Sequence, residues 1–163
     1  MRILSSKNAV LVDSSATFAL IGKVVALELP TDDQYTISIN RPTDASTSDV
    51  GDFTLYLAHP QELSAGQPVT DNLDNPHDNY YLVHESDQAF TLTYRLLSGT
   101  VRPDIDVNEI QDGGLNEMIE MRGDNLTEGK VLLPADADLL ITVGGLFKID
   151  PEKPTGSYQI IVS

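Results

Sequence analysis

Apolar and polar residues alternate along several short stretches of this chain, which is the pattern of β-strands that bury one face. The clearest alternation covers residues 89–97, where aromatic and leucine side chains share one face and threonine and arginine side chains share the other. Runs of apolar residues predict further strands at 9–12, 16–20, 23–29, 34–40, 53–58, 80–83, 130–133, 139–143, 146–150 and 157–162. Turn signals rich in Gly, Pro, Asp and Asn separate these runs. The pattern predicts an all-β chain folded as a single antiparallel β-sandwich or jelly roll.

One stretch has the composition of a helix. Leu115, Met118, Ile119 and Arg122 lie at the i, i+3, i+4 and i+7 positions of a helical face. A strand over the same residues would place Met118 and Ile119 on opposite faces, and the pattern leaves both interpretations open. The predicted sandwich therefore contains at most one short helix.

The dipeptide Gly144-Gly145 lies between two apolar runs near the end of the chain. Two consecutive glycines between strands predict a tight hairpin, because both central residues of a type I′ turn need a positive φ. A proline-rich turn then leads to the last predicted strand, residues 157–162. This closing meander is predicted to organise the sandwich.

A length of 163 residues is typical of one domain. Residues 1–12 are predicted to form an N-terminal arm or edge strand, and residues 13–163 a single sandwich domain. Residues 101–114 resemble an acidic, irregular loop. Residues 59–79 contain three prolines and little periodicity, which predicts a long loop. Because structureless loops of this length are uncommon in compact domains, it is predicted to contact a partner or to move on the surface.

The charge of the chain restricts its partners. Asp and Glu number 25 against 10 Lys and Arg, which gives a formal net charge of −15. Nucleic acids and anionic lipids would repel such a chain, so we expect neither as a partner. The sequence contains no cysteine, which excludes disulfides, thiolate nucleophiles and cysteine-bound zinc.

The first residues do not have the form of a secretory signal. The apolar run at 10–12 ends at Asp13, and the next run is interrupted by Lys23 and Glu28. A signal peptide needs roughly 7–15 consecutive apolar residues, and a membrane span needs more. We therefore expect synthesis in a host cytoplasm without a signal or a transmembrane segment. Whether the native chain has a processed N-terminus stays open.

Asp104, Asp106 and Asn108 match the opening D-x-D-x-N of a calcium loop. The sixth position of that pattern requires Gly and the twelfth requires Glu, but here they hold Glu109 and Leu115. The turn glycine and the bidentate ligand are therefore both missing from a standard loop.

Two further acids, Asp112 and Glu117, could still add oxygens to an irregular cation site at this place. The competing interpretation is a solvated acidic loop between Asp104 and Asp112. The range Asp71–Asn79 could likewise hold a hard cation or place His77 near carboxylates. We predict no metal site from either stretch.

Nothing in the sequence predicts catalysis. The histidines His59, His77 and His84 lack the spacing of known metal motifs, and no G-x-S-x-G, P-loop or dinucleotide fingerprint is present. Aromatic residues make up 6% of the chain and tryptophan is absent, whereas sugar clefts usually stack on aromatics. Of Tyr80 and Tyr81, one is predicted to lie in the core. We expect no enzyme activity, no catalytic residue and no cofactor.

The closing meander resembles the final hairpin of bacterial pilin-like surface β-sandwich domains. The matching residues are Gly144, Gly145, Leu146, Pro154, Gly156 and Tyr158. The ranges 16–20 and 35–39 are similar to a strand pair of the same family. The resemblance covers about a third of the chain; it implies an immunoglobulin-like or pilin-like sandwich and a role in an assembly.

We expect a non-enzymatic structural protein of a large assembly that acts through protein–protein contacts. Its cysteine-free, acidic β domain resembles virion proteins of bacteriophages, such as capsid decoration, minor capsid or head–tail proteins. Its partners would be copies of itself, as a homo-oligomer, and other structural proteins of the virion. One alternative is a subunit of an extracellular pilus-like filament or surface layer built by strand donation. A second alternative is a carbohydrate- or calcium-binding accessory module.

Overall fold

A computed structural model describes most of the chain. The described residues are 2–13, 29, 31–38, 55–73, 78–99, 103–111, 114–122, 126–145 and 156–163. The predicted strands at 16–20, 23–29 and 146–150 therefore lie wholly or almost wholly outside them.

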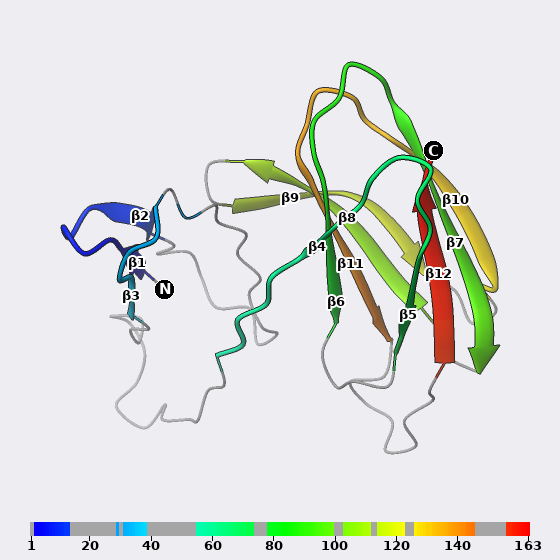
Figure 1. The fold of residues 1–163 in the computed structure, drawn as a ribbon, viewed down its shortest axis with the longest axis horizontal. Helices are drawn as coiled ribbons and strands as arrows, with labels where there is room; N and C mark the ends of the chain where they lie inside the picture. The colour runs from blue at the N-terminus through cyan, green and yellow to red at the C-terminus, as the bar shows by residue number, and fades with distance from the viewer. Residues whose placement is uncertain are drawn as a thin grey trace, which may run out of the picture. The chain divides into compact units, whose positions relative to one another are not determined.

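The described residues form strands and no helix, which confirms the predicted all-β class (Figure 1). The twelve strands are β1 (Arg2–Leu4), β2 (Val10–Asp13), β3 (Thr36–Ser38), β4 (Gln61–Glu62), β5 (Val69–Asn72), β6 (Asn79–Val83), β7 (Phe90–Gly99), β8 (Pro103–Gln111), β9 (Gly114–Arg122), β10 (Glu128–Leu133), β11 (Leu139–Gly145) and β12 (Gly156–Val162). In this part of the chain no helix is long and apolar enough to cross a membrane.

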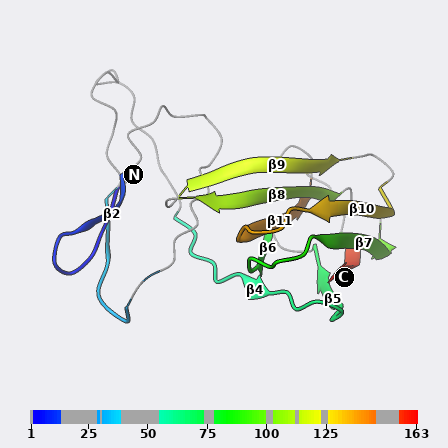
Figure 2. The same cartoon turned by 90° about the horizontal axis from the view of Figure 1, so that it is seen from above.

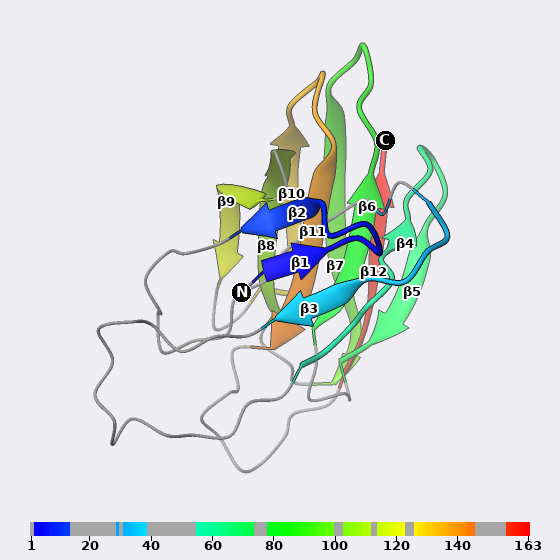
Figure 3. The ribbon, with the colours of Figure 1, turned by 90° about the vertical axis from the view of Figure 1, so that its left-hand side faces the viewer.

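The chain divides into two compact units. The first comprises Met1–Leu57 with Asp112–Leu115, and the second comprises Ala58–Gln111 with Asn116–Ser163. In the first unit, β1 lies between β2 and β3 in a three-stranded antiparallel sheet (Figure 3). The expected arm or edge strand at 1–12 thus contains a central strand, β1, and most of an edge strand, β2. The expected domain boundary at residue 13 falls within this unit.

The second unit contains the predicted β-sandwich. Its four-stranded sheet has the order β10-β7-β12-β5, and its five-stranded sheet has the order β4-β6-β11-β8-β9. The four-stranded sheet is antiparallel throughout, whereas in the five-stranded sheet β4 pairs with β6 in parallel. Figure 2 shows β8 and β9 running side by side, at one end of the five-stranded sheet.

The two sheets share one hydrophobic core. Alternate residues of the central strands point inward and are almost completely buried: Tyr81, Val83, Leu92, Tyr94, Ile105, Val107, Leu133, Leu139, Ile141, Val143, Tyr158, Ile160 and Val162. Each such side chain stabilises the fold by roughly 1.5–3 kcal/mol when it leaves water. The alternation that predicted strands 89–97, 139–143 and 157–162 therefore marks the buried face.

The segment 59–79, which we expected to be a long loop, contains β4 and β5. Leu63 and Leu73 follow these strands and belong to the core. Residues Val69–Asn72 contain a single apolar residue, so their sequence gives little sign of a strand. In β5, which pairs with β12 at the edge of the sheet, Val69 packs against the core and the other side chains are half-buried or exposed, so the strand carries few apolar residues.

The acidic stretch around Asp104 is also a strand and not a loop. Ile105 and Val107 of β8 are buried in the core, while Asp104 and Asp106 face the other way. The prediction of an irregular loop was wrong because the polar residues, read alone, concealed an alternation. Residues 115–122 form strand β9, which decides between the helix and strand interpretations.

The glycine pair Gly144-Gly145 does not form a tight hairpin. Both residues belong to β11, where they pair with Asp104 and Pro103 of β8. A Cβ atom at Gly144 would lie 3.0 Å from Cγ of Asp78, so the carboxylate of Asp78 would have to turn away. The glycine gives the Asp78 side chain room to fold across the strand.

The predicted strand at 53–58 does not form over its described part. Residues 55–58 have no assigned strand, and the side chains of Leu55 and Leu57 are exposed. Alternation alone did not suffice here, because a strand forms only as part of a sheet, and the three described sheets do not include residues 55–58.

Candidate functional site

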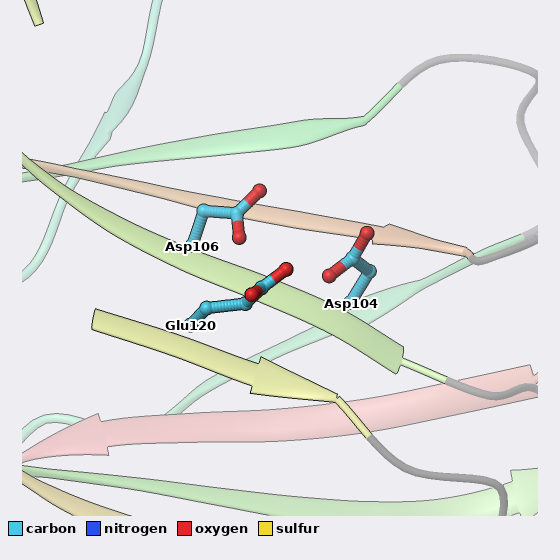
Figure 4. Close-up of side chains that lie close together, drawn as sticks. All are labelled: Asp104, Asp106 and Glu120. Carbon is cyan, nitrogen blue, oxygen red and sulfur yellow. The ribbon is translucent and has the colours of Figure 1, made fainter. Parts of the chain in front are cut away.

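Three carboxylates meet on the outer face of the five-stranded sheet. Asp104 and Asp106 come from β8 and Glu120 comes from the neighbouring edge strand β9. One oxygen from each lies within 4.8 Å of the others, and the three side chains point toward one another (Figure 4). Among the described residues this is the one group of three or more acidic, histidine or cysteine side chains close enough to share an ion. We call it the carboxylate cluster.

The cluster follows from strand geometry. Side chains two residues apart on a strand lie on the same face, so the buried Ile105 places its neighbours Asp104 and Asp106 together on the outer one. On β9, Ile119 and Met121 pack against the core, so Glu120 between them also faces outward. Adjacent strands lie about 4.8 Å apart, which brings Glu120 within reach of both aspartates.

Arg122 partly neutralises this charge. Its Nε donates a hydrogen bond of 2.7 Å to Oδ1 of Asp104 and forms an ion pair with Glu120. The bond to Asp104 raises the pKa of the Arg122 guanidinium. One guanidinium thus serves two carboxylates, and Asp106 has no cation of its own among its described contacts.

Asp106 is the member with the unusual environment. Its Oδ1 is shut off from solvent and has no hydrogen-bond partner in the described part of the chain. Burial raises the pKa of Asp106 to about 6, and the negative charge of Asp104 adds to this, while Arg122 opposes it. A buried carboxylate oxygen without a donor is costly, and a proton or a hard cation would relieve that cost.

The cluster can therefore do two things chemically. It can take up a proton on Asp106, or it can supply oxygen ligands to a cation such as Ca²⁺, which prefers carboxylates and carbonyls. Three carboxylates fall short of the six to eight oxygens that Ca²⁺ takes, so water or backbone oxygens would complete the shell. Arg122 would have to leave Asp104 or Glu120 for a cation to use both.

The sequence named only part of this site. It singled out Asp104 and Asp106, and the structure brings these two together. Asn108 lies on the same strand but outside the carboxylate cluster, and Asp112 lies outside the described residues. Glu117 is near enough for its charge to raise the pKa of Asp106.

Sequence reasoning missed Glu120 and Arg122. The sequence did contain a signal for these two residues. The dipeptide Asp112-Gly113 is typical of tight hairpin turns, and it lies between two alternating runs. Treating 103–111 and 114–122 as neighbouring strands would have placed the charges of the second beside Asp104 and Asp106.

The described residues of the other stretches tested in the sequence form no cluster of this kind. His84 lies between two carboxylates, 3.7 Å from Glu62 and 3.4 Å from Asp138, on the exposed surface. His59 is exposed and its ring contacts the carbonyl of Pro60. His77 lies outside the described residues.

Asp71, at the start of the second stretch considered for a cation, serves the core instead. It accepts a hydrogen bond of 3.0 Å from the hydroxyl of Tyr81, the member of the Tyr80-Tyr81 pair that is buried as predicted. Tyr81 in turn bonds to the hydroxyl of Tyr158, which also accepts from Asn79 at 2.9 Å. This polar chain links β6 of one sheet to β12 and β5 of the other.

Tyr94 contrasts with these partnered tyrosines. Its ring stacks on that of Tyr158, with centroids 5.7 Å apart. Its hydroxyl is buried without a hydrogen-bond partner in the described structure, and burial raises its pKa to about 12. Tyr158, whose hydroxyl is hydrogen-bonded, thus lies beside Tyr94, whose hydroxyl has no partner among the described residues.

Comparisons with known proteins concern the fold. No protein-family model and no curated protein matches the chain. Among solved structures, it is similar to the pre-peptidase C-terminal domain of collagenase from Bacillus anthracis, with 11% identity and a TM-score of 0.50 over 68% of this chain and all of that one. It also matches PliG of Aeromonas hydrophila, a periplasmic inhibitor of g-type lysozyme, with 13% identity and a TM-score of 0.39 over 64% of this chain and all of that one. At these identities the first likeness describes a shared fold, and the finer resemblance to pilin-like or virion proteins receives no support from a family model.

Proposed function

We propose that this chain is a non-enzymatic structural protein of a large assembly that acts through protein–protein contacts. The observation that carries the proposal is the side of the sandwich where both sheets end. Strand β9 ends the five-stranded sheet and β10 ends the four-stranded sheet. A methyl group on Gly129 of β10 would lie 3.4 Å from Sδ of Met121 on β9, so the two edges meet on the same side.

Edge strands offer backbone groups to another chain, and proteins usually protect them. Here both edges carry exposed apolar side chains: Met118 on β9 is 43% exposed and Leu132 on β10 is 67% exposed. We call this side the β9/β10 edge. Met118 and Leu132 alternate with core-facing residues and therefore lie on opposite outer faces of the sandwich, so one added strand meets only one of them. A neighbour's strand that pairs with β10 would use its open backbone and pack against Leu132.

The specific assembly that we propose is a virion, in which the chain would be a capsid decoration, minor capsid or head–tail protein. The acidic surface supports a position facing solvent, away from nucleic acid. The alternative is an extracellular pilus-like filament or surface layer, because strand donation would use the same kind of edge.

The test substitutes Leu132→Lys and compares it with Leu97→Lys. Leu97 is 48% exposed on β7, an inner strand of the same sheet, so it matches Leu132 in chemistry but not in position. The tagged full chain is produced in its source cells, and large particles and filaments are isolated by sedimentation and viewed by immunogold electron microscopy. We expect Leu132→Lys to lower incorporation at least tenfold and Leu97→Lys to leave it unchanged.

The images also identify the assembly. Label on phage particles supports the virion, and label on cell-surface fibres supports the filament. Equal incorporation of both variants would refute the role of the β9/β10 edge. If the chain occurs only as a free monomer and labels neither phage particles nor cell-surface fibres, the assembly function itself is refuted.

A calcium-binding accessory module is a second candidate function. Two observations favour it. Oδ1 of Asp106 is buried without a hydrogen-bond partner among the described residues. Two further carboxylates, those of Asp104 and Glu120, offer oxygens within 4.8 Å. Under this proposal Ca²⁺ displaces Arg122 and ties β8 to the β9 edge. Asp106→Asn removes one charged ligand while it preserves shape.

Isothermal titration with Ca²⁺ at pH 7.5 tests this second candidate, with Mg²⁺ as the competing ion. We expect saturable binding and a rise in Tm in the wild-type chain, both lost in Asp106→Asn. Asp136→Asn, which removes an exposed acid outside the cluster, is the control for general charge effects. No heat and no Tm shift at millimolar Ca²⁺ would remove the candidate without affecting the assembly proposal.

A further inference from the structure

We draw no further inference here: the strongest candidate, the carboxylate cluster of Asp104, Asp106 and Glu120 on the outer face of the five-stranded sheet, belongs to the site already described and has no additional feature that points to another ligand.

Discussion

The buried tyrosines provide two substitutions that should change stability in opposite directions. Tyr81→Phe removes a hydroxyl that donates to the carboxylate of Asp71 and bonds to Tyr158. Tyr94→Phe removes a hydroxyl that has no partner among the described residues. Both rings are almost completely buried, and Phe fills nearly the same volume, so the changes differ mainly in hydrogen bonding.

The magnitudes follow from these bonds. A hydrogen bond to a charged group contributes about 1.5–3 kcal/mol and a neutral one about 1 kcal/mol, so Tyr81→Phe should lower the free energy of unfolding by about 3 kcal/mol. An unpartnered buried hydroxyl costs about 1–3 kcal/mol, so Tyr94→Phe should raise the free energy of unfolding by about 1 kcal/mol. For a chain of this size, 1 kcal/mol corresponds to roughly 2–4 °C in Tm.

Differential scanning calorimetry and urea titration of the full chain would measure both effects. We expect Tm to fall by roughly 6–12 °C in Tyr81→Phe and to rise by roughly 2–4 °C in Tyr94→Phe. A similar loss of stability in both variants would refute the reasoning, because it would mean that the Tyr94 hydroxyl is as well bonded as that of Tyr81.

Three further experiments test the site and the packing. Because the pKa of Asp106 is raised from 3.8 to about 6, its charged form destabilises the fold above pH 6, and this penalty disappears as the pH falls from 6 to 4. Asp106→Asn should therefore be about 1 kcal/mol more stable than the wild type at pH 8, a value reduced for partial solvent screening. In urea titrations, this difference in the free energy of unfolding should disappear near pH 4. A difference that stays constant with pH would contradict the assignment. Gly144→Ala should cost about 1 kcal/mol, because the new methyl group displaces the carboxylate of Asp78, and Asp78→Ala in the same chain should recover most of it; no recovery would place the strain elsewhere. Leu92→Ala, at a completely buried position, should cost about 2–5 kcal/mol by chemical denaturation, and a loss below 1 kcal/mol would show that the core is not packed as described.

The sequence predicted the strands whose inner faces are strongly apolar. Residues 89–97 and 157–162 correspond to β7 and β12, whose alternate residues fill the core. The same rule should have found β8, since Ile105 and Val107 alternate with Asp104 and Asp106. There the acidic composition of residues 101–114 concealed the periodicity.

The remaining differences arise from information that lies outside any local pattern. Strand β5 is defined by its pairing with β12, which comes much later in the chain, and not by its own composition. Gly144 was interpreted as a turn residue because its neighbour in space, Asp78, comes directly before β6 and is distant in the sequence. The carboxylate cluster could be predicted in part, because two members share one strand, whereas Glu120 becomes visible only once β8 and β9 are paired.

The position of β12 has a consequence for how the protein is made. This strand lies between β7 and β5 in the four-stranded sheet, yet it is the last of the described strands to be synthesised. Until it leaves the ribosome, β7 and β5 have no strand between them, and Leu92 and Tyr94 cannot be covered. Because such non-local pairing must wait for loop closure over a long chain, folding of this sheet should be slow. Nascent chains would expose apolar strand edges until β12 is made, so misassembly can begin in this interval even when the final fold is stable.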